Sequence, residues 1–316
     1  MKMMIVGGNG QVGQALCYEL GYLGHETVIF SSKDDRSGFS KKVWDCDGVF
    51  IAIPTADHGE KAFAYITDSL REGKLVVTCE KGSLSWYFPD LREYLDRIGF
   101  SATVGGGSGM LSLFENSFRV KRIFGVVNAT LNFLLLKLAT GQSWESAVRE
   151  AVALGILEPN GSSDLIGVMR SEFGDVLSKL CILFNLSKVM GARRTLRPIN
   201  FSGDTSFLEN FEEFSRRGFR VAIYIGKEEI AMIPVLFTYR DSFVRREKWL
   251  IQAGFVDPKS FPEFSFPRDR GNTLLVEDYS GISQVTGTGA GPRETAGMMI
   301  ADMNRLMMKN QNRSLR

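Results

Sequence analysis

Residues 3–13 read MMIVGGNGQVG, and this stretch decides the fold predicted for the chain. Residues 3–6 are apolar and too few for a helix, so they suit a buried strand, whereas residues 14–20 carry apolar positions at helical spacing. Strand, glycine-rich turn and helix give the GxGxxG pattern the context of a dinucleotide-binding motif. The alternative is a glycine turn without a ligand.

Each glycine of this motif has a separate role. Gly8 permits the tight turn, Gly10 lets the backbone approach a pyrophosphate, and Gly13 lets the helix lie close to the strand. The helix N-terminus then presents N–H groups and the positive end of its dipole to the phosphates. The predicted phosphate-binding residues are Gly8, Asn9, Gly10, Gln11, Val12 and Gly13.

Length and composition describe an ordinary globular protein of one or two domains. The chain has 316 residues, of which 44% are hydrophobic and 23% charged, and its net charge of +2 gives no reason to expect nucleic acid or an anionic membrane as a partner. No apolar stretch reaches the roughly 18 residues of a membrane span. The N-terminus enters a strand directly, so we expect no signal peptide.

The scarce cysteines and histidines narrow the chemistry. Four scattered cysteines without CxxC spacing predict reduced, buried thiols of a cytoplasmic protein. Two histidines, His25 and His58, argue against a histidine metal site and a histidine general base. Any proton transfer is therefore expected to use lysine, aspartate or glutamate.

The end of the second predicted strand, residues 26–30, indicates the cofactor. In NAD-preferring folds this strand ends in an acid that holds the ribose 2′-hydroxyl. Here it ends in Ser31, Ser32 and Lys33, with Arg36 nearby, and these side chains suit a 2′-phosphate. We therefore predict NADP as the cofactor, with NAD as the alternative. If these side chains bind no ligand, they form a solvated loop.

Alternating strands and helices extend this pattern over the first hundred residues. The next strand ends at Ile53, Pro54 and Thr55, whose place at its carboxyl end predicts contact with the cofactor. A helix over 60–71, a strand over 74–79, a helix over 88–98 and a short strand over 102–104 follow. The predicted fold class is α/β, a Rossmann-type doubly wound parallel sheet plus an α+β domain for catalysis and dimerisation.

Three segments are expected from the change in pattern. Residues 1–118 form the dinucleotide-binding domain, and residues 119–286 form the substrate-binding domain, whose Val- and Ile-rich strands suggest a homodimer. Residues 287–316 carry a second glycine turn with Gly289 and a helix that returns to the cofactor domain. The second domain's predicted elements are strands over 119–127, 219–225, 230–239 and 273–276, and helices that follow Ser143 and span 168–186.

Five motifs in order resemble the homoserine dehydrogenase family, and the likeness covers nearly the whole chain. They are residues 77–82 (VTCEKG), 102–107 (ATVGGG), 125–132 (GVVNATLN), 153–159 (ALGILEP) and 287–296 (GTGAGPRETA). The resemblance implies NAD(P)-dependent oxidation of L-homoserine to L-aspartate 4-semialdehyde, or the reverse, in threonine and methionine biosynthesis. It also implies a short form without the regulatory ACT domain, so feedback by threonine through that domain is not expected.

The resemblance also implies the site residues. Lys179 is the expected general acid–base, Lys81 supports it, and Asp175 binds the substrate ammonium and orients Lys179 from the same helical face. The expected substrate-binding residues are Gly155, Glu158, Asp164 and Asp175, with Asp164 ordering the loop.

The chain departs from the family in this region. The register after Gly167 places Met169 and Phe173 where aspartate and lysine are due, so Asp175 and Lys179 fit only with six extra residues. Ser101 replaces a usual glutamate, and Glu80 replaces a usual asparagine. An Asp/Lys pair at this spacing is otherwise most often an exposed helical ion pair.

Other interpretations remain for the site and for the whole chain. We interpret three residues as caps that satisfy a helix end, in preference to contacts with the substrate: Asn128, Thr130 and Asn132. Two rival functions are a reductase of another small aldehyde or keto acid and a catalytically inactive NADP-binding protein.

Overall fold

The structure is a computed structural model, and it describes residues 1–31, 33–115, 117–157, 164–189, 194–203, 211–232, 235–240 and 249–314. The chain divides into two compact units. Unit 1 contains residues 1–107 and 291–316, and unit 2 contains residues 108–290. The C-terminal segment therefore belongs to the same unit as the N-terminal glycine motif.

Unit 1 is built on a parallel sheet, and the described strands lie in the order β2-β1-β3-β4-β5. Their bounds are β1 (Lys2–Val6), β2 (Glu26–Phe30), β3 (Gly48–Ile51), β4 (Leu75–Thr78) and β5 (Ile98–Gly99). The chain moves outward from β1 to β2 and then in the opposite direction from β3 to β5. This reversal makes the carboxyl ends of β1 and β3 the topological switch point, where open α/β sheets bind ligands.

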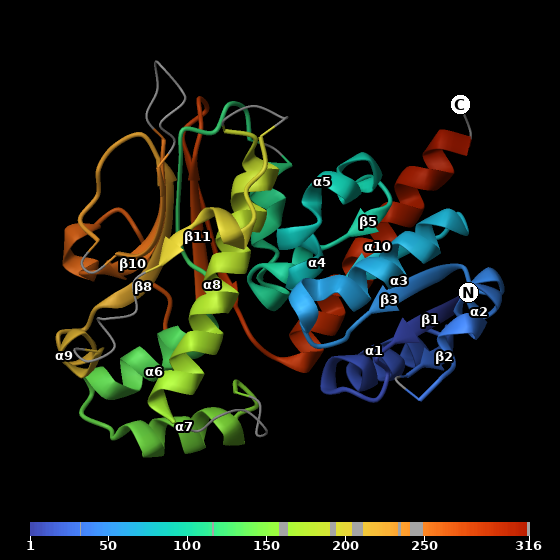
Figure 1. The fold of residues 1–316 in the computed structure, drawn as a ribbon, viewed down its shortest axis with the longest axis horizontal. Helices are drawn as coiled ribbons and strands as arrows, with labels where there is room; N and C mark the ends of the chain where they lie inside the picture. The colour runs from blue at the N-terminus through green and yellow to red at the C-terminus, as the bar shows by residue number, and fades with distance from the viewer. Residues whose placement is uncertain are drawn as a thin grey trace. The chain divides into compact units, whose positions relative to one another are not determined.

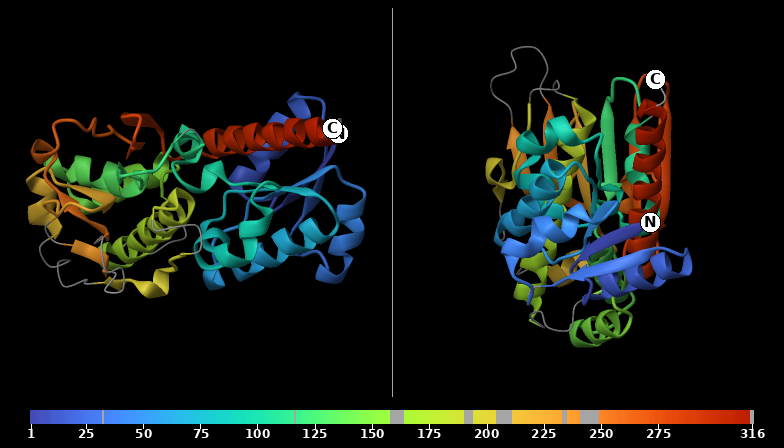
Figure 2. Two further views of the ribbon diagram at one scale, coloured as in Figure 1. Left: turned by 90° about the horizontal axis from the view of Figure 1, so that it is seen from above. Right: turned by 90° about the vertical axis from the view of Figure 1, so that its right-hand side faces the viewer.

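Helices cover both faces of this sheet (Figures 1 and 2). Met3 and Ile5 of β1 form one core with Leu16 of α1 and Met299 of α10. Alternate residues of each strand point to the other face, toward α3. The helix bounds are α1 (Gln11–Tyr22), α2 (Phe39–Trp44), α3 (Glu60–Arg71), α4 (Lys81–Trp86), α5 (Phe88–Leu91) and α10 (Pro292–Ser314). The doubly wound parallel sheet predicted from the sequence is confirmed.

Two predicted elements of unit 1 are wrong. The helix expected over 88–98 ends at Leu91 and continues as a 3₁₀ turn over Arg92–Tyr94, because the carbonyl of Arg97 accepts a sheet hydrogen bond from the N–H of Val76 at 3.0 Å. The strand expected over 102–104 is a 3₁₀ turn, Ser101–Thr103. The hydroxyl of Thr103 donates to the carbonyl of Phe100 at 2.7 Å, a local bond that competes with strand geometry.

Unit 2 contains an antiparallel sheet, with the described strands in the order β12-β11-β6-β8-β10-β9-β7. Their bounds are β6 (Arg122–Val126), β7 (Ser202–Gly203), β8 (Arg220–Gly226), β9 (Val235–Arg240), β10 (Leu250–Val256), β11 (Gly271–Glu277) and β12 (Ile282–Thr288). The strand expected over 230–239 starts too early. The N–H of Met232 donates to the carbonyl of Ile230 at 3.0 Å, and this three-residue turn precedes β9.

Helices cover one face of the sheet in unit 2, and aromatic side chains fill the other. The helix bounds are α6 (Ala129–Ala139), α7 (Trp144–Ala153), α8 (Leu165–Ser187) and α9 (Phe211–Arg216). Phe124 of β6 stacks on Phe261 with ring centroids 4.7 Å apart. The caps predicted at Asn128 and Ser143 are confirmed, since their side chains accept from the N–H groups of Leu131 and Ser146. Among the described helices, none has the length and apolar character to cross a bilayer.

Candidate functional site

The glycine turn after β1 lies against the end of β3. Gly7 has φ 88°, and a Cβ added there would lie 2.4 Å from the carbonyl oxygen of Ala52. A Cβ added at Gly13 would lie 2.2 Å from the carbonyl oxygen of Gly7. Strand, turn and helix can therefore approach this closely only because both positions lack a side chain.

Gly10 differs from these two glycines, and it tests whether the turn fits a dinucleotide. Its φ is −77°, which any residue can adopt, and an added Cβ would come no nearer than 3.4 Å to the carbonyl oxygen of Gly7. Neither backbone strain nor crowding within the protein requires glycine here. The missing side chain instead leaves the start of α1 open to close approach, as a pyrophosphate needs. The residues present therefore fit the phosphates of a dinucleotide.

An acidic residue organises the loop after β2. Asp34 accepts hydrogen bonds from the N–H and hydroxyl of Ser31 at 2.7 and 2.9 Å, and Lys42 pairs with it at 2.6 Å. The hydrogen bond from Lys42, followed by those from Ser31, lowers the pKa of Asp34 to about 2. Sequence patterns did not predict this role for Asp34, although it directly follows Lys33. Ser32 lies outside the described residues.

Arg36 is held beside this loop. Its guanidinium pairs with Asp68 at 2.5 Å and lies 4.0 Å from the ring centre of Tyr65 and 4.6 Å from that of Phe39. These contacts fix a positive charge near the end of β2. Its expected contact with a 2′-phosphate stays a prediction.

Lys81 is the first residue of α4, and its neighbour Glu80 fixes that start. The buried Glu80 carboxylate accepts from the N–H groups of Gly82 and Ser83 at 2.5 and 2.8 Å, and from the hydroxyl of Thr55 at 2.5 Å. Thr55 follows Ile53 and Pro54 after the end of β3, so this bond ties together two segments predicted to meet the cofactor. Glu80, which stands where the family usually has asparagine, thus caps α4.

Cys79, two residues before Lys81, is a neutral thiol. Burial raises its pKa to about 11, against the smaller opposing effect of the Lys81 charge. At neutral pH this sulfur is not a thiolate nucleophile.

In unit 2, α8 brings Asp175 and Lys179 together. The Lys179 amine lies 2.6 Å from a carboxylate oxygen of Asp175 and donates to the carbonyl of Val127 at 2.7 Å. The two side chains are only 9% and 18% exposed, so this is not the exposed ion pair that is common at such a spacing.

Two asparagines complete this cluster. The amide of Asn128 donates to Asp175 at 2.9 Å and to Glu172 at 2.7 Å, while its oxygen caps α6. The amide of Asn272, in β11, donates at 3.2 Å to the same Val127 carbonyl that Lys179 contacts. Glu172 and Asn272 were missed because the first departs from the family pattern and the second lies in a poorly matching segment.

The alternative register in α8 falls on two apolar side chains. Met169 and Phe173 are 0% and 2% exposed and belong to the core. They carry neither a carboxylate nor an amine, so at that register α8 offers no acid and no proton carrier. The polar cluster lies instead at Asp175 and Lys179, six residues further along.

Two of the remaining predicted substrate residues shape helix ends. Asp164 caps α8 by accepting from the N–H of Gly167 at 2.8 Å. Gly155 follows α7 with φ 65°, a conformation typical of a helix C-terminal cap. Glu158 lies outside the described residues. Gly289 makes room for Asn272, because an added Cβ would lie 2.2 Å from its amide nitrogen; a cofactor contact there stays a prediction.

Comparison with known proteins identifies the family. The sequence model of the homoserine dehydrogenase family matches residues 109–303, more than half of the chain. The chain belongs to the homoserine dehydrogenase family. The resemblance predicted from the sequence motifs is therefore confirmed.

The chain is also similar to individual homoserine dehydrogenases. The homoserine dehydrogenase of Methanocaldococcus jannaschii is 26% identical over 271 residues, which cover 82% of this chain and 72% of that relative. The homoserine dehydrogenase of Lactococcus lactis is 25% identical over 273 residues, but the match spans only 59% of its length. The crystal structure of homoserine dehydrogenase from Thermoplasma acidophilum has 21% identity and a TM-score of 0.70 and covers 98% of this chain and 99% of that one, which shows a shared fold.

One departure from the homoserine dehydrogenase pattern has a structural counterpart. Where the family usually has glutamate, Ser101 donates its N–H and hydroxyl to Asp302 of α10 at 2.7 and 2.8 Å. Arg305 also contacts this carboxylate. The acid at this position of unit 1 is thus supplied by α10, a contact that no sequence pattern predicted.

Proposed function

We propose that this chain catalyses the NAD(P)-dependent interconversion of L-homoserine and L-aspartate 4-semialdehyde. One observation carries the proposal within the family: a buried lysine, Lys179, is ion-paired with Asp175 inside the region that the family model matches. A lysine amine can exchange a proton with a reacting oxygen, and a carboxylate can bind an ammonium. These are the two polar tasks that an amino alcohol substrate requires.

The cofactor would be held by unit 1 and, when bound, supplies the nicotinamide carbon that accepts or gives the hydride. The turn at Gly10 would admit the pyrophosphate, and Ser31, Lys33 and Arg36 would meet a 2′-phosphate. Support for NADP comes from a hyperthermophilic archaeal homoserine dehydrogenase solved with NADPH, which has 19% identity, a TM-score of 0.63 and 98% coverage of both chains. A relative from Pseudomonas canavaninivorans, 26% identical over 274 residues, is named NAD(+)-dependent. NADP is our proposal, with NAD as the alternative.

Lys179 is assigned the proton transfer. Its amine is fixed by the Val127 carbonyl and by Asp175, so it can donate a proton to the aldehyde oxygen in reduction and accept the hydroxyl proton in oxidation. Asn272 would assist as a positioning residue, because it holds the same Val127 carbonyl. Lys81 is assigned a supporting role at the cofactor and the reacting oxygen, from its place at the start of α4.

Substrate binding is assigned to acids. Asp175 and Glu158 would hold the substrate ammonium, and Asp164 would order the loop before α8 through its cap. Gly155 would let the chain turn toward this loop. Asn128 keeps Asp175 in place, since it donates to that carboxylate.

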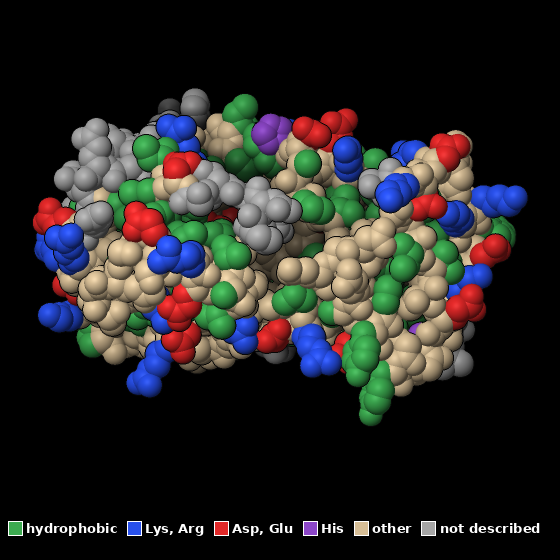
Figure 3. Space-filling model, turned by 90° about the horizontal axis from the view of Figure 1, so that it is seen from below, with side chains coloured by type: hydrophobic (Ala, Val, Ile, Leu, Met, Phe, Trp, Pro, Cys, Tyr) green, Lys and Arg blue, Asp and Glu red, His purple; other side chains and the backbone are tan. Residues whose placement is uncertain are grey.

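The partner and compartment follow the same proposal. On the face shown in Figure 3, acidic and basic side chains lie interspersed rather than gathered by sign, which suits a small-molecule substrate better than nucleic acid. The described cysteines are free thiols, as expected for the cytoplasm.

We also propose a homodimer formed through unit 2, where β12 is an edge strand with Ile282 55% exposed.

A direct assay tests the function. Wild-type protein is mixed with L-homoserine and either NADP⁺ or NAD⁺, and reduced cofactor and aspartate 4-semialdehyde are measured together. We expect saturable turnover, faster with NADP⁺. Cofactor binding without turnover of homoserine would favour an inactive binding protein, and turnover of another hydroxy acid in its place would favour a reductase of different specificity.

A further inference from the structure

A cavity of about 730 Å³ lies in unit 2, apart from every residue assigned to the reaction. Its size falls within the roughly 300–1,000 Å³ of small-molecule sites. Its wall includes five basic and two acidic side chains together with aromatic rings. The basic ones are Arg119, Lys121, Arg122, Lys188 and Lys227.

Three of these cations have no ion-pair partner in the described part of the chain. Arg122 pairs with Glu277 at 3.0 Å and with Glu263 at 3.3 Å. By contrast, no described carboxylate forms an ion pair with Arg119, Lys121 or Lys188. Basic side chains therefore outnumber acidic ones in the described wall of the cavity, although the charge of the nearby Asp278 acts on Lys121.

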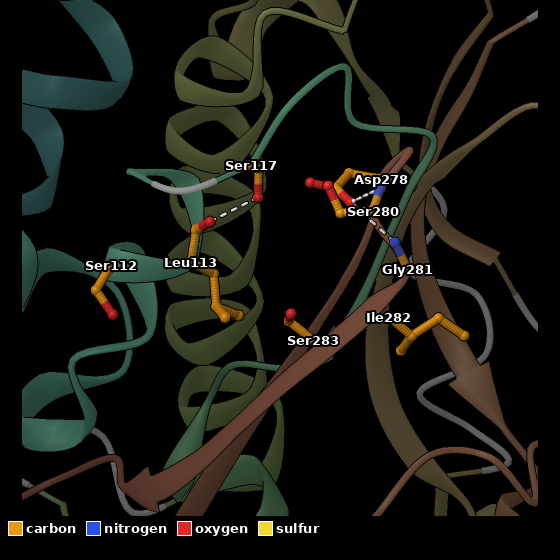
Figure 4. Close-up of a pocket in the computed structure, with 8 residues that line it drawn as sticks. All are labelled: Ser112, Leu113, Ser117, Asp278, Ser280, Gly281, Ile282 and Ser283. Carbon is orange, nitrogen blue, oxygen red and sulfur yellow. Dashed lines mark hydrogen bonds between the residues drawn. The ribbon is translucent and has the colours of Figure 1, made fainter.

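The basic segment is held in place by its backbone. The N–H of Phe118 donates to Asp278 at 2.8 Å, the N–H of Lys121 donates to the carbonyl of Glu277 at 2.7 Å, and the N–H of Tyr279 donates to the carbonyl of Phe118. Figure 4 shows the neighbouring smaller hollow, where Asp278 also accepts from the N–H groups of Ser280 and Gly281. The Asp278 carboxylate, which lines this hollow, thus also holds Phe118 at the edge of the larger cavity.

Two cationic residues at this cavity have unusual backbone conformations. Arg119 and Lys188 have φ values of 55° and 53°, in the left-handed region that non-glycine residues seldom adopt. At Lys188 this conformation ends α8, whereas at Arg119 it lies in the loop before β6, and strained backbone of this kind is found mainly at functional sites. Lys188 directly follows α8, so the cavity lies about 13 Å along the helix axis from Lys179.

Aromatic rings lie among the cations. Lys121 is 4.5 Å and Arg119 is 5.9 Å from the ring centre of Tyr279, which is 63% exposed. Trp249, 6% exposed, forms part of the wall. Clustered guanidinium and ammonium groups match phosphate oxygens, and exposed rings can stack on a planar group.

We propose that this cavity binds a polyphosphate group, either free or carried by a nucleotide. The proposal does not depend on the reaction assigned to the chain, since none of the residues involved takes part in it.

The test uses wild-type protein saturated with NADPH, so that a nucleotide does not report on unit 1, and titrates it calorimetrically with inorganic triphosphate and with ATP. Both probes should bind, and the Lys121→Gln/Lys188→Asn variant should weaken both by about a hundredfold or more, roughly the effect of losing two charge-assisted contacts. Asparagine is chosen at 188 because it tolerates the left-handed backbone. The charge-matched control Lys259→Gln/Arg268→Gln, on exposed residues outside the cavity, should bind as the wild type does.

A second pair of measurements distinguishes a nucleotide from free polyphosphate as the ligand. If the ligand is a nucleotide, ATP binds more tightly than triphosphate and Tyr279→Leu removes the difference; if it is free polyphosphate, the two probes bind alike. Failure of both probes to bind at millimolar concentration would overturn the proposal, and so would binding that the cavity variant leaves unchanged. If the double variant does not fold, Tyr279→Leu and the salt dependence of binding take its place, and binding that changes with neither would overturn the proposal.

Discussion

Replacing Lys179 by methionine separates its chemistry from its packing. The Lys179 amine lies 2.6 Å from Asp175 and 2.7 Å from the Val127 carbonyl, and the side chain is 9% exposed. Methionine has a similar length and no charge, so it can fill the same space. The variant therefore removes a proton carrier and leaves the carboxylate of Asp175 without its cation.

The magnitude of each effect follows from the contacts. Removing one partner of a fully buried ion pair costs about 3–5 kcal/mol. Asp175 is 18% exposed and retains the hydrogen bond from Asn128, so we expect a loss of about 1–3 kcal/mol in the free energy of unfolding. Loss of general acid–base catalysis should lower kcat by about 10²–10⁴, which corresponds to roughly 2.7–5.5 kcal/mol of barrier.

Urea denaturation and steady-state kinetics with L-homoserine measure the two effects. The Lys179→Met/Asp175→Leu variant removes both charges and should recover most of the stability while kcat stays low. Lys137→Met is the matched control, because Lys137 pairs with Glu150 at 2.5 Å in a more exposed place. It should keep its kcat and lose at most about 1 kcal/mol. A Lys179→Met enzyme with kcat within tenfold of the wild type would refute the assignment.

Five further substitutions test four positions of unit 1. Gly10→Ala should leave the free energy of unfolding nearly unchanged but weaken NADPH binding about tenfold. Gly13→Ala should lower stability in urea, because its Cβ would lie 2.2 Å from the Gly7 carbonyl oxygen. Equal stability of the two variants would contradict this. Glu80→Ala should cost about 1–2 kcal/mol of stability, and Glu80→Asn, which keeps a capping oxygen, should cost less. Burial raises the pKa of Asp302, so the folded chain binds this proton more tightly than the unfolded chain. The free energy of unfolding should therefore fall as pH rises from about 4 through the raised pKa. Asp302→Asn should remove this part of the pH dependence in urea denaturation at successive pH values.

Much of unit 1 could be predicted because its signals are local. The apolar run, the glycine turn and the amphipathic spacing around α1 lie within twenty residues, and the helix expected over 60–71 is α3. The error over 88–98 arises where a distant contact overrides local preference, because β4 draws Arg97 into sheet pairing. The error over 102–104 combines the local bond from Thr103 to Phe100 with a distant one, since Asp302 holds Ser101 from the far end of the chain.

Unit 2 was harder to predict for the same reason. Strand β12 reads ISQVTGT, which does not alternate apolar and polar residues and contains Gly287, so its pairing with β11 has little local signal. In the site, spacing and family likeness pointed to Asp175 and Lys179, but Asn272 reaches the Val127 carbonyl only because β11 lies beside the end of β6. No periodicity in the sequence reports a contact of that kind.

Transfer of isotope from the substrate tests the proposed reaction most directly. L-homoserine carrying deuterium on its carbinol carbon is incubated with the wild-type protein and NADP⁺, and the reduced cofactor is examined by mass spectrometry. We predict that the nicotinamide gains the deuterium in step with formation of aspartate 4-semialdehyde. Reduced cofactor without the label, or no reduction by homoserine with either NADP⁺ or NAD⁺, would contradict hydride transfer from this substrate.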